Sequence, residues 1–260
     1  KYIDSLSLMA GIAAAQSLGT EPWPEEIRRD FGVVLGTAFG AMNSMVDFDT
    51  QSVLHGPNTV NPMDFPNTVA NAAGSRIGIW LQLKGPNVTL TNGGTSFIDA
   101  VGFAWEGANN GLFKYCLAGA AEHMPSFLET VLPPSASHPA YQKGAGLLLA
   151  SLEGTEDVLF KVTDYFAVQL KPDGSLPTPF RDRWEGFWTD VNWVGGLPEK
   201  IFSDLALPGK IKNSFSGGAW ELGLGGWNAL NGFLASSQRA GVLAAYCGFE
   251  GKLSLLKVIK

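Results

Sequence analysis

Several residue types that carry chemistry are scarce in this sequence. Its 260 residues include two cysteines and three histidines, and no Cys or His pair has the spacing of metal ligands, so we expect no metal site. The net charge is −6 and lysines and arginines do not cluster, which argues against a nucleic-acid partner. No apolar run approaches the roughly 18 residues that a membrane-spanning helix needs. These absences favour a cytoplasmic protein with neither metal nor nucleic acid.

The two cysteines and three histidines give little sign of a reactive site. Cys116 lies in an apolar run and Cys247 beside an aromatic residue, which predicts two buried thiols in a reducing compartment rather than a disulfide or a nucleophile. His55, His123 and His138 are expected to be solvated or structural. The chain starts at Lys1 rather than Met, which suggests that a few residues precede it.

What the chain does contain is apolar residues, at 45%, and 32 glycines, enough for one large domain or two small ones. The apolar run Phe31–Leu35 predicts a buried strand, and periodicity predicts a helix over Ser96–Asn109. A first helix over Asp4–Leu18 is expected to pack through Leu8, Ile12 and Ala15. Strands and helices alternate, so the sequence predicts an α/β fold.

The stretch from Gly56 to Phe103 is the most informative part of the chain. Two Pro-containing turns lead to a predicted small-residue helix, Asn67–Ile77, and then to a β-branched strand, Val88–Thr91. That strand breaks at Asn92-Gly93-Gly94 and a helix follows from Thr95. Such an elbow exposes one side chain beside a helix N-terminus, and it is a common place for a nucleophile.

This stretch resembles the β-ketoacyl synthases, condensing enzymes of the thiolase fold. Their NP..FP segment, GLKGP-like turn and Thr-Ala-Cys-Ser/Thr-Ser elbow correspond here to Asn61–Pro66, Leu83–Pro86 and Asn92–Ser96. The resemblance places the family's acyl-accepting cysteine at Gly94. One of the two family histidines falls near Gly218, and the other belongs to a segment that this chain lacks. The resemblance therefore implies the architecture of a condensing enzyme without its catalytic residues.

The family fold implies two duplicated βαβ-rich halves in an αβαβα arrangement. Here they are expected over about 1–150 and 151–260 of a single domain, 1–260, with a shortened second half. Residues Lys171–Leu207 show no clear period and predict an irregular connection. The Gly36–Gly40 turn lacks the GxGxxG spacing, so a dinucleotide loop is a weak alternative there.

Some condensing enzymes pair with subunits that kept the fold but lost the nucleophile, and the chain resembles these chain length factors, specifically the compact ones of aryl polyene-type pathways. The resemblance implies a cytoplasmic heterodimer with a catalytic ketosynthase, in polyketide or fatty-acid-like synthesis, no cofactor, and a chain delivered by an acyl carrier protein. It also places the subunit boundary at the elbow strand, Val88, Thr89, Leu90 and Thr91. Helix residues implied to line the acyl tunnel share one face: Val69, Ala72, Ala73 and Arg76.

Three alternatives stay open on sequence alone. The chain could be a free-standing acyl-binding or regulatory pseudo-ketosynthase, or an enzyme that uses Thr95 or Ser96 as the nucleophile. A hydroxyl nucleophile needs a base within hydrogen-bond reach, and the sequence offers no obvious one. Both residues also suit the cap of the following helix. For the small-residue helix, close helix packing explains the alanines as readily as a tunnel does.

Overall fold

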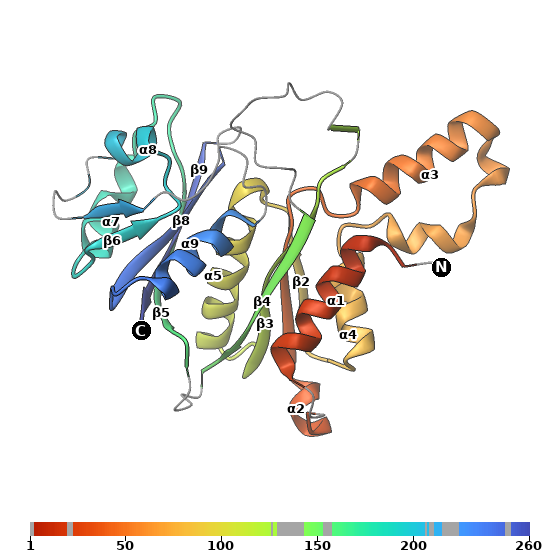
Figure 1. The fold of residues 1–260 in the computed structure, drawn as a ribbon, viewed down its shortest axis with the longest axis horizontal. Coiled ribbons are helices and arrows are strands. Elements are labelled where there is room, and N and C mark those ends of the chain that lie inside the picture. The colour runs from red at the N-terminus through yellow and green to blue at the C-terminus, as the bar shows by residue number, and fades with distance from the viewer. Residues whose placement is uncertain are drawn as a thin grey trace.

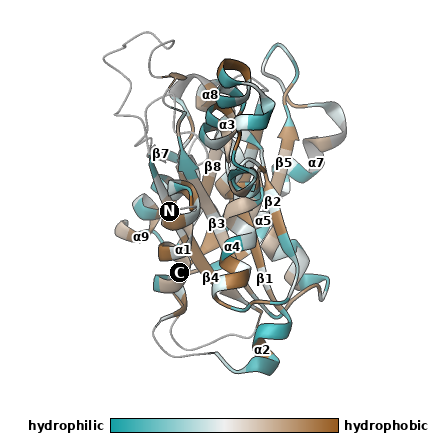
Figure 2. Ribbon diagram, turned by 90° about the vertical axis from the view of Figure 1, so that its right-hand side faces the viewer, coloured by the Kyte–Doolittle hydropathy of each residue, from teal (hydrophilic) through white to brown (hydrophobic). Residues whose placement is uncertain are grey.

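The computed structural model describes residues 3–19, 23–125, 127–128, 143–152, 158–205, 207, 211–214, 224–247 and 251–260. Two β-sheets lie side by side with helices between them and on their outer faces, which gives five layers in the order αβαβα (Figure 1). The colour of apolar residues is strongest on the strands, whereas α2 is hydrophilic (Figure 2). The layered architecture predicted from the sequence is confirmed.

Each sheet is built from consecutive stretches of the chain. The first sheet has the order β2-β1-β3-β4, and its strands are β1 (Phe31–Gly36), β2 (Asn87–Leu90), β3 (Tyr115–His123) and β4 (Lys143–Ser151). The second has the order β5-β9-β8-β6-β7, with β5 (Lys161–Gln169), β6 (Trp193–Gly195), β7 (Lys212–Ser214), β8 (Ala240–Cys247) and β9 (Lys252–Ile259).

The two sheets repeat one topology. In the first, β1 is parallel to β2 and β3, and β4 runs antiparallel to β3. In the second, β6 is parallel to β7 and β8, and β9 runs antiparallel to β8. β5 adds a further antiparallel strand beside β9. This correspondence is the internal duplication that the sequence resemblance implied.

The helices occupy three of the layers. Their bounds are α1 (Ser5–Leu18), α2 (Glu25–Arg29), α3 (Met42–His55), α4 (Ala72–Trp80), α5 (Ser96–Asn109), α7 (Arg181–Phe187), α8 (Glu199–Asp204) and α9 (Gly225–Ala235). Short 3₁₀ turns are η1 (Pro57–Thr59), η2 (Pro62–Asn67), η3 (Gly93–Thr95) and η4 (Thr178–Phe180). Helices α1 and α4 cover the outside of the first sheet, and α7 and α8 that of the second, while α5 and α9 lie between the sheets (Figure 1).

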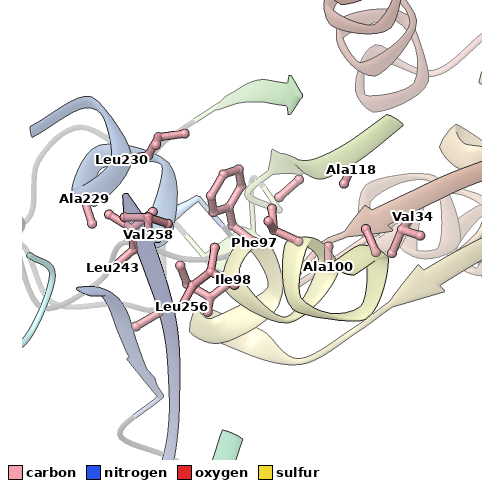
Figure 3. Close-up of a cluster of buried hydrophobic side chains, with 14 of the residues drawn as sticks. Val34, Phe97, Ile98, Ala100, Ala118, Ala229, Leu230, Leu243, Leu256 and Val258 are labelled. Atoms are coloured by element: carbon pink, nitrogen blue, oxygen red, sulfur yellow. The ribbon is translucent and has the colours of Figure 1, made fainter. Parts of the chain in front are cut away.

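The largest buried cluster lies in the middle layer, where α5 and α9 meet both sheets. Phe97 and Ile98 of α5 face the side chains of α9 and the second sheet (Figure 3). Both are fully buried, as are Val34 and Ala118 on the first-sheet side. Burying aromatic and aliphatic side chains is the main favourable term in folding, so α5 holds the two sheets together.

Three expectations about individual elements need correction. The small-residue helix begins at Ala72 rather than Asn67, because Pro62 and Pro66 hold the preceding stretch in η2. Residues Lys171–Leu207 are not an irregular connection: they form η4, α7, β6 and α8. Their order comes from burial of Trp184, Phe187 and Trp188 against the second sheet.

The first helix packs through a different face from the one expected. Leu8 and Ile12 are about half exposed, at 52% and 51%, whereas Ala10 and Ala14 are completely buried. A Cβ at Gly11 would lie 2.4 Å from the Trp80 ring, so only glycine lets α4 approach there. Small side chains thus bring α1 close to α4 and the sheet together with the buried Leu6, whereas Leu8, Ile12 and Ala15 point outward.

Helix α3 projects from the layered body with η1 and η2 (Figure 1). None of its residues is buried, and Val53 and Leu54 are 82% and 68% exposed. Met63 and Phe65 of η2 are also exposed. Within the described part of the chain, no helix combines the length and apolarity required to cross a bilayer.

Candidate functional site

The elbow forms where the sequence predicted it. β2 ends at Leu90, η3 makes one tight turn, and α5 begins at Ser96. Gly93 has a φ of +57°, a left-handed conformation that costs other residues energy. Gly94, which the sequence resemblance places at the family's cysteine, thus lies in a strand–turn–helix junction of the expected kind and carries no side chain.

The two hydroxyls beside Gly94 are held in hydrogen bonds within the elbow. Thr95 Oγ1 lies 2.9 Å from the Asn92 carbonyl and 2.8 Å from Asp99 Oδ2, and either can accept its proton. Ser96 Oγ lies 2.8 Å from the Gly93 carbonyl and accepts from the Asn92 N–H at 3.1 Å. Both residues are completely buried, so neither hydroxyl is presented to a substrate.

The predicted capping role is wrong in its details. Thr95 occupies the N-cap position of α5, but its side chain accepts no N–H of the first turn. Its backbone is already helical, with φ −93° and ψ −2°, whereas a capping side chain usually requires an extended backbone. Its hydroxyl reaches Asp99, one turn further along the helix, instead.

The carboxylate of Asp99 lies at the centre of a buried polar cluster. Its Oδ2 accepts from Asn92 Nδ2 at 2.7 Å and from Lys252 Nζ at 2.6 Å, and it also lies against the Thr95 hydroxyl. Its Oδ1 accepts from the Tyr165 hydroxyl at 2.8 Å. These groups come from the elbow, α5, β5 and β9. The cluster therefore joins the elbow to the second sheet.

The charge state of this cluster limits its chemistry. Burial alone would raise the pKa of the Asp99 carboxyl, but the Lys252 ammonium, with the nearby hydroxyls of Ser254 and Tyr165, outweighs burial and lowers the pKa below its usual value. Burial and the charge of Asp99 raise the pKa of Tyr165. Asp99 is therefore a poor proton acceptor, and it cannot activate Thr95 as a nucleophile at neutral pH.

The Gly36–Gly40 turn after β1 is occupied by a carboxylate of the chain itself. Glu122, completely buried at the end of β3, accepts from the backbone N–H groups of Ala38 at 2.6 Å and Phe39 at 3.2 Å. These amides are the donors that a phosphate would use. The alternative of a dinucleotide loop is therefore not supported.

Both cysteines are buried and free, as predicted. Burial raises the pKa of the Cys116 thiol to about 12, so it is not a thiolate at neutral pH. His55 ends the projecting helix α3 and His123 ends β3, while His138 and Gly218 lie outside the described residues. Across the described residues, no group of His, Cys, Asp or Glu is arranged to hold a metal ion.

The residues assigned to a tunnel do not share one helix. Val69 precedes α4 and is 39% exposed, whereas Ala72 and Ala73 are buried in its first turn. Arg76 pairs with Asp4, the N-cap residue of α1, and with Asn67. Ala73 belongs to the core that α4 forms with α1, and Val69 is the one member of the set with substantial exposed surface.

The residues assigned to a subunit boundary lie at the edge of the first sheet. β2 pairs with β1 on one side and is the terminal strand in the described sheet. Val88, Thr89 and Leu90 are partly buried, and Thr91 follows the strand and is exposed. The structure thus places these four residues together at an edge.

The comparisons with known proteins agree with this geometry. A profile described as the N-terminal domain of beta-ketoacyl synthase matches residues 2–132, half of the chain. The chain belongs to the beta-ketoacyl synthase family. It is 29% identical over 115 residues to the 3-oxoacyl-[acyl-carrier-protein] synthase 2 of Vibrio harveyi, which is 44% of this chain but 28% of that protein. The matched region of this beta-ketoacyl synthase family member thus covers well under half the length of its curated relative.

Solved structures extend the likeness to nearly the whole fold. The ishigamide ketosynthase/chain length factor matches with a TM-score of 0.76 at 22% identity, covering 99% of this chain and 81% of that one. A type II polyketide synthase acyl-carrier protein complex with its ketosynthase, AntDE:AntF, matches with 0.72 at 17% identity, covering 99% and 84%. At these identities the likeness establishes the thiolase-like fold of ketosynthases, in a chain shorter than its neighbours.

Sequence reasoning singled out Asn92 and Thr95 but missed Asp99, Tyr165 and Lys252, the other members of the Asp99 cluster. Thr95, Asp99 and Gly102 recur at spacings of four and three, so they share one face of an otherwise apolar helix. A lone carboxylate on such a face is a signal of a buried partner. Lys252 and Tyr165 gave no comparable signal, because nothing local ties them to α5.

We expect Gly93→Ala to destabilise the chain through two separable effects. The left-handed φ costs an alanine roughly 1–2 kcal/mol, and its Cβ would lie 3.0 Å from Cys247 Sγ. Urea unfolding of Gly93→Ala, Cys247→Ala and the double variant measures both. The double variant should be more stable than the sum of the single losses predicts, because it relieves the contact. Additive losses would mean that the thiol does not crowd the elbow.

Proposed function

We propose that this chain is a non-catalytic ketosynthase-like subunit, a chain length factor. It pairs with an active β-ketoacyl synthase and shapes the tunnel that holds the growing acyl chain. The observation that carries the proposal is the elbow, which keeps its strand–turn–helix geometry while Gly94 occupies the position of the nucleophile. The neighbouring hydroxyls are buried and engaged, and Asp99 is a poor base.

The pairing itself is supported by the edge strand and its surroundings. β2 offers backbone donors and acceptors on its outer side, and unpaired strand edges readily pair with other chains. Nearby surface is apolar: Ile79 and Trp80 of α4 are 72% and 41% exposed. Permanent interfaces of this kind bury about 2,000 Å² or more, and an apolar edge of this type suits one.

The reaction setting follows from the same proposal. The catalytic subunit supplies the thiolate and performs the acyl transfer, and an acyl carrier protein delivers the chain in the cytoplasm. The product class is a polyketide, with aryl polyene-type or fatty-acid-like elongation as the specific setting. The shortened second half, about 151–260, of the single domain 1–260 suits a subunit that lacks a histidine pair.

Purified alone, the chain is expected to carry no acyl group after incubation with acyl- and malonyl-loaded carrier protein. Gly94→Cys should remain unable to condense malonyl units, because a thiolate without two histidine-type groups cannot stabilise the developing enolate. Intact-mass spectrometry and release of CO₂ provide the measurements, with a catalytic type II polyketide ketosynthase as the positive control. A covalent adduct on Thr95, Ser96 or either cysteine of the unmodified chain would overturn the proposal.

Co-expression with that same ketosynthase tests the pairing. The two chains should co-purify at a ratio of one to one and elute together in size-exclusion chromatography. A chain that stays monomeric and monodisperse at micromolar concentration beside the ketosynthase would instead identify a free-standing acyl-binding or regulatory protein.

A further inference from the structure

The Asp99 cluster is more elaborate than packing alone requires. Four donors converge on one carboxylate that is 2% exposed, and one of them is the ammonium of Lys252, whose side chain is 21% exposed. Taking two charges out of water is costly, and apolar residues of similar volume often replace such pairs without loss of stability. What an ion pair adds is one defined geometry, because its hydrogen bonds are directional.

Apart from the hydrogen bonds of Ser96 to the Gly93 and Thr37 carbonyls, which tie the turn to the first sheet, side chains do little to hold the elbow in one geometry. Gly93 and Gly94 have no side chains to pack, and glycine loses more backbone freedom on folding than any other residue. The preceding strand, β2, is four residues long and lies at an edge. Asn92 and Thr95, at the two ends of this turn, both reach the cluster, at 2.7 and 2.8 Å from Asp99 Oδ2. The position at which β2 ends is therefore tied to the carboxylate.

The second sheet holds the other end of the cluster. Tyr165 of β5 lies flat on α5 at Gly102, where a Cβ would come within 2.3 Å of its ring. The ring contact at Gly102 places the Tyr165 hydroxyl where it donates to Asp99 Oδ1. Lys252 opens β9 and pairs across the ladder with Cys247, whose sulfur lies 3.0 Å from the position that a Cβ of Gly93 would take. The neighbouring strands β8 and β9 of the second sheet thus meet the elbow at adjacent points.

We infer that Asp99 and Lys252 are positioning residues that fix the elbow on the second sheet, and with it the end of β2 that faces the partner subunit. The link to partner binding rests on the proposed function, whereas the positioning of the elbow does not. In this arrangement the ion pair restricts the backbone of the elbow, which Gly93 and Gly94 would otherwise leave free to adopt several conformations. The elbow keeps its shape although no catalytic side chain is there to require it.

Hydrogen exchange of the full chain, read by mass spectrometry, tests the positioning. The main variant is Asp99→Leu/Lys252→Met, which replaces the pair with apolar side chains and avoids leaving one charge buried alone. We expect exchange in peptides covering residues 87–96 to become at least about tenfold faster, while peptides of β3 keep their wild-type rates. The matched control is Asp4→Asn, which breaks a second part-buried ion pair, with Arg76, and should leave residues 87–96 unchanged.

Two results would overturn the inference: unchanged exchange at residues 87–96 in the folded double variant, or faster exchange spread evenly over the chain, which indicates a loss of global stability alone. If the double variant does not fold, Tyr165→Phe carries the same test, because it removes one hydrogen bond and keeps the charges. Its expected effect is a local acceleration of about threefold, and the same two results would count against the inference.

Co-purification with the catalytic ketosynthase used in the pairing test separates this inference from the proposed function. If wild-type chain binds that ketosynthase and the double variant binds it at least about tenfold less tightly, both stand. If the wild-type chain does not bind while the exchange result is local, the positioning role stands and the proposed pairing fails. Equal binding by both chains, with local exchange, would overturn the extension to the partner-facing end of β2.

Discussion

Thr89→Pro is expected to abolish co-purification with a catalytic ketosynthase partner while the chain itself still folds. The Val33 N–H donates to the Pro86 carbonyl at 2.8 Å, and the Thr37 N–H donates to the Leu90 carbonyl at 2.9 Å. In a parallel ladder every second residue bonds the neighbouring strand, so the backbone of Thr89 faces away from β1. A proline there removes an outward donor and leaves the bonds to β1 in place.

The physical reason for a large effect is that proline is tolerated at a free edge and excluded from the middle of a sheet. If β2 becomes an interior strand in the complex, the ring and the lost donor both oppose pairing, and binding should weaken at least about tenfold. Thr89→Val is the matched control, because it keeps the backbone N–H and the shape of the side chain. It should bind like wild type. Equal binding by Thr89→Pro would place the interface elsewhere.

The parts of the fold that followed from sequence are those with strong local signals. The strand β1 is a continuous apolar run bounded by glycine, and all its residues are buried. The helix α5 has the bounds predicted from its period. The elbow between β2 and α5 was predicted because two glycines interrupt a β-branched run, which a regular element does not accommodate.

The parts that sequence could not predict depend on long-range contacts. The seven residues of α7 and three of β6 are too few to show a period, and their order comes from aromatic burial against the second sheet. The outward face of α1 could not be read from its larger side chains, because its small residues pack more closely. Lys252 lies 153 positions from Asp99, so no pattern within one element connects them.

Val69→Phe is expected to shorten the product of the reconstituted pair without weakening the complex. Val69 is 39% exposed and directly precedes α4, which packs on the edge strand β2. Under the proposed function, which places the acyl tunnel along the subunit boundary, a larger side chain there narrows that tunnel, and the growing chain stops where it meets the obstruction. The shift should increase with side-chain volume from Leu to Phe, as measured by mass spectrometry of the products.

The structure decides which substitution can test the tunnel. Ala73 is completely buried against α1, so Ala73→Phe would overpack the core at a cost of about 1–3 kcal/mol and confuse lost folding with lost length control. Val69 has room for a ring without displacing the core. Val53→Phe is the matched control. Val53 lies on the projecting helix α3 and is 82% exposed, so the same ring is added in solvent and product length should stay unchanged. Unchanged product lengths in an intact Val69→Phe complex would remove this stretch from the tunnel and leave close packing as the reason for the alanines of α4.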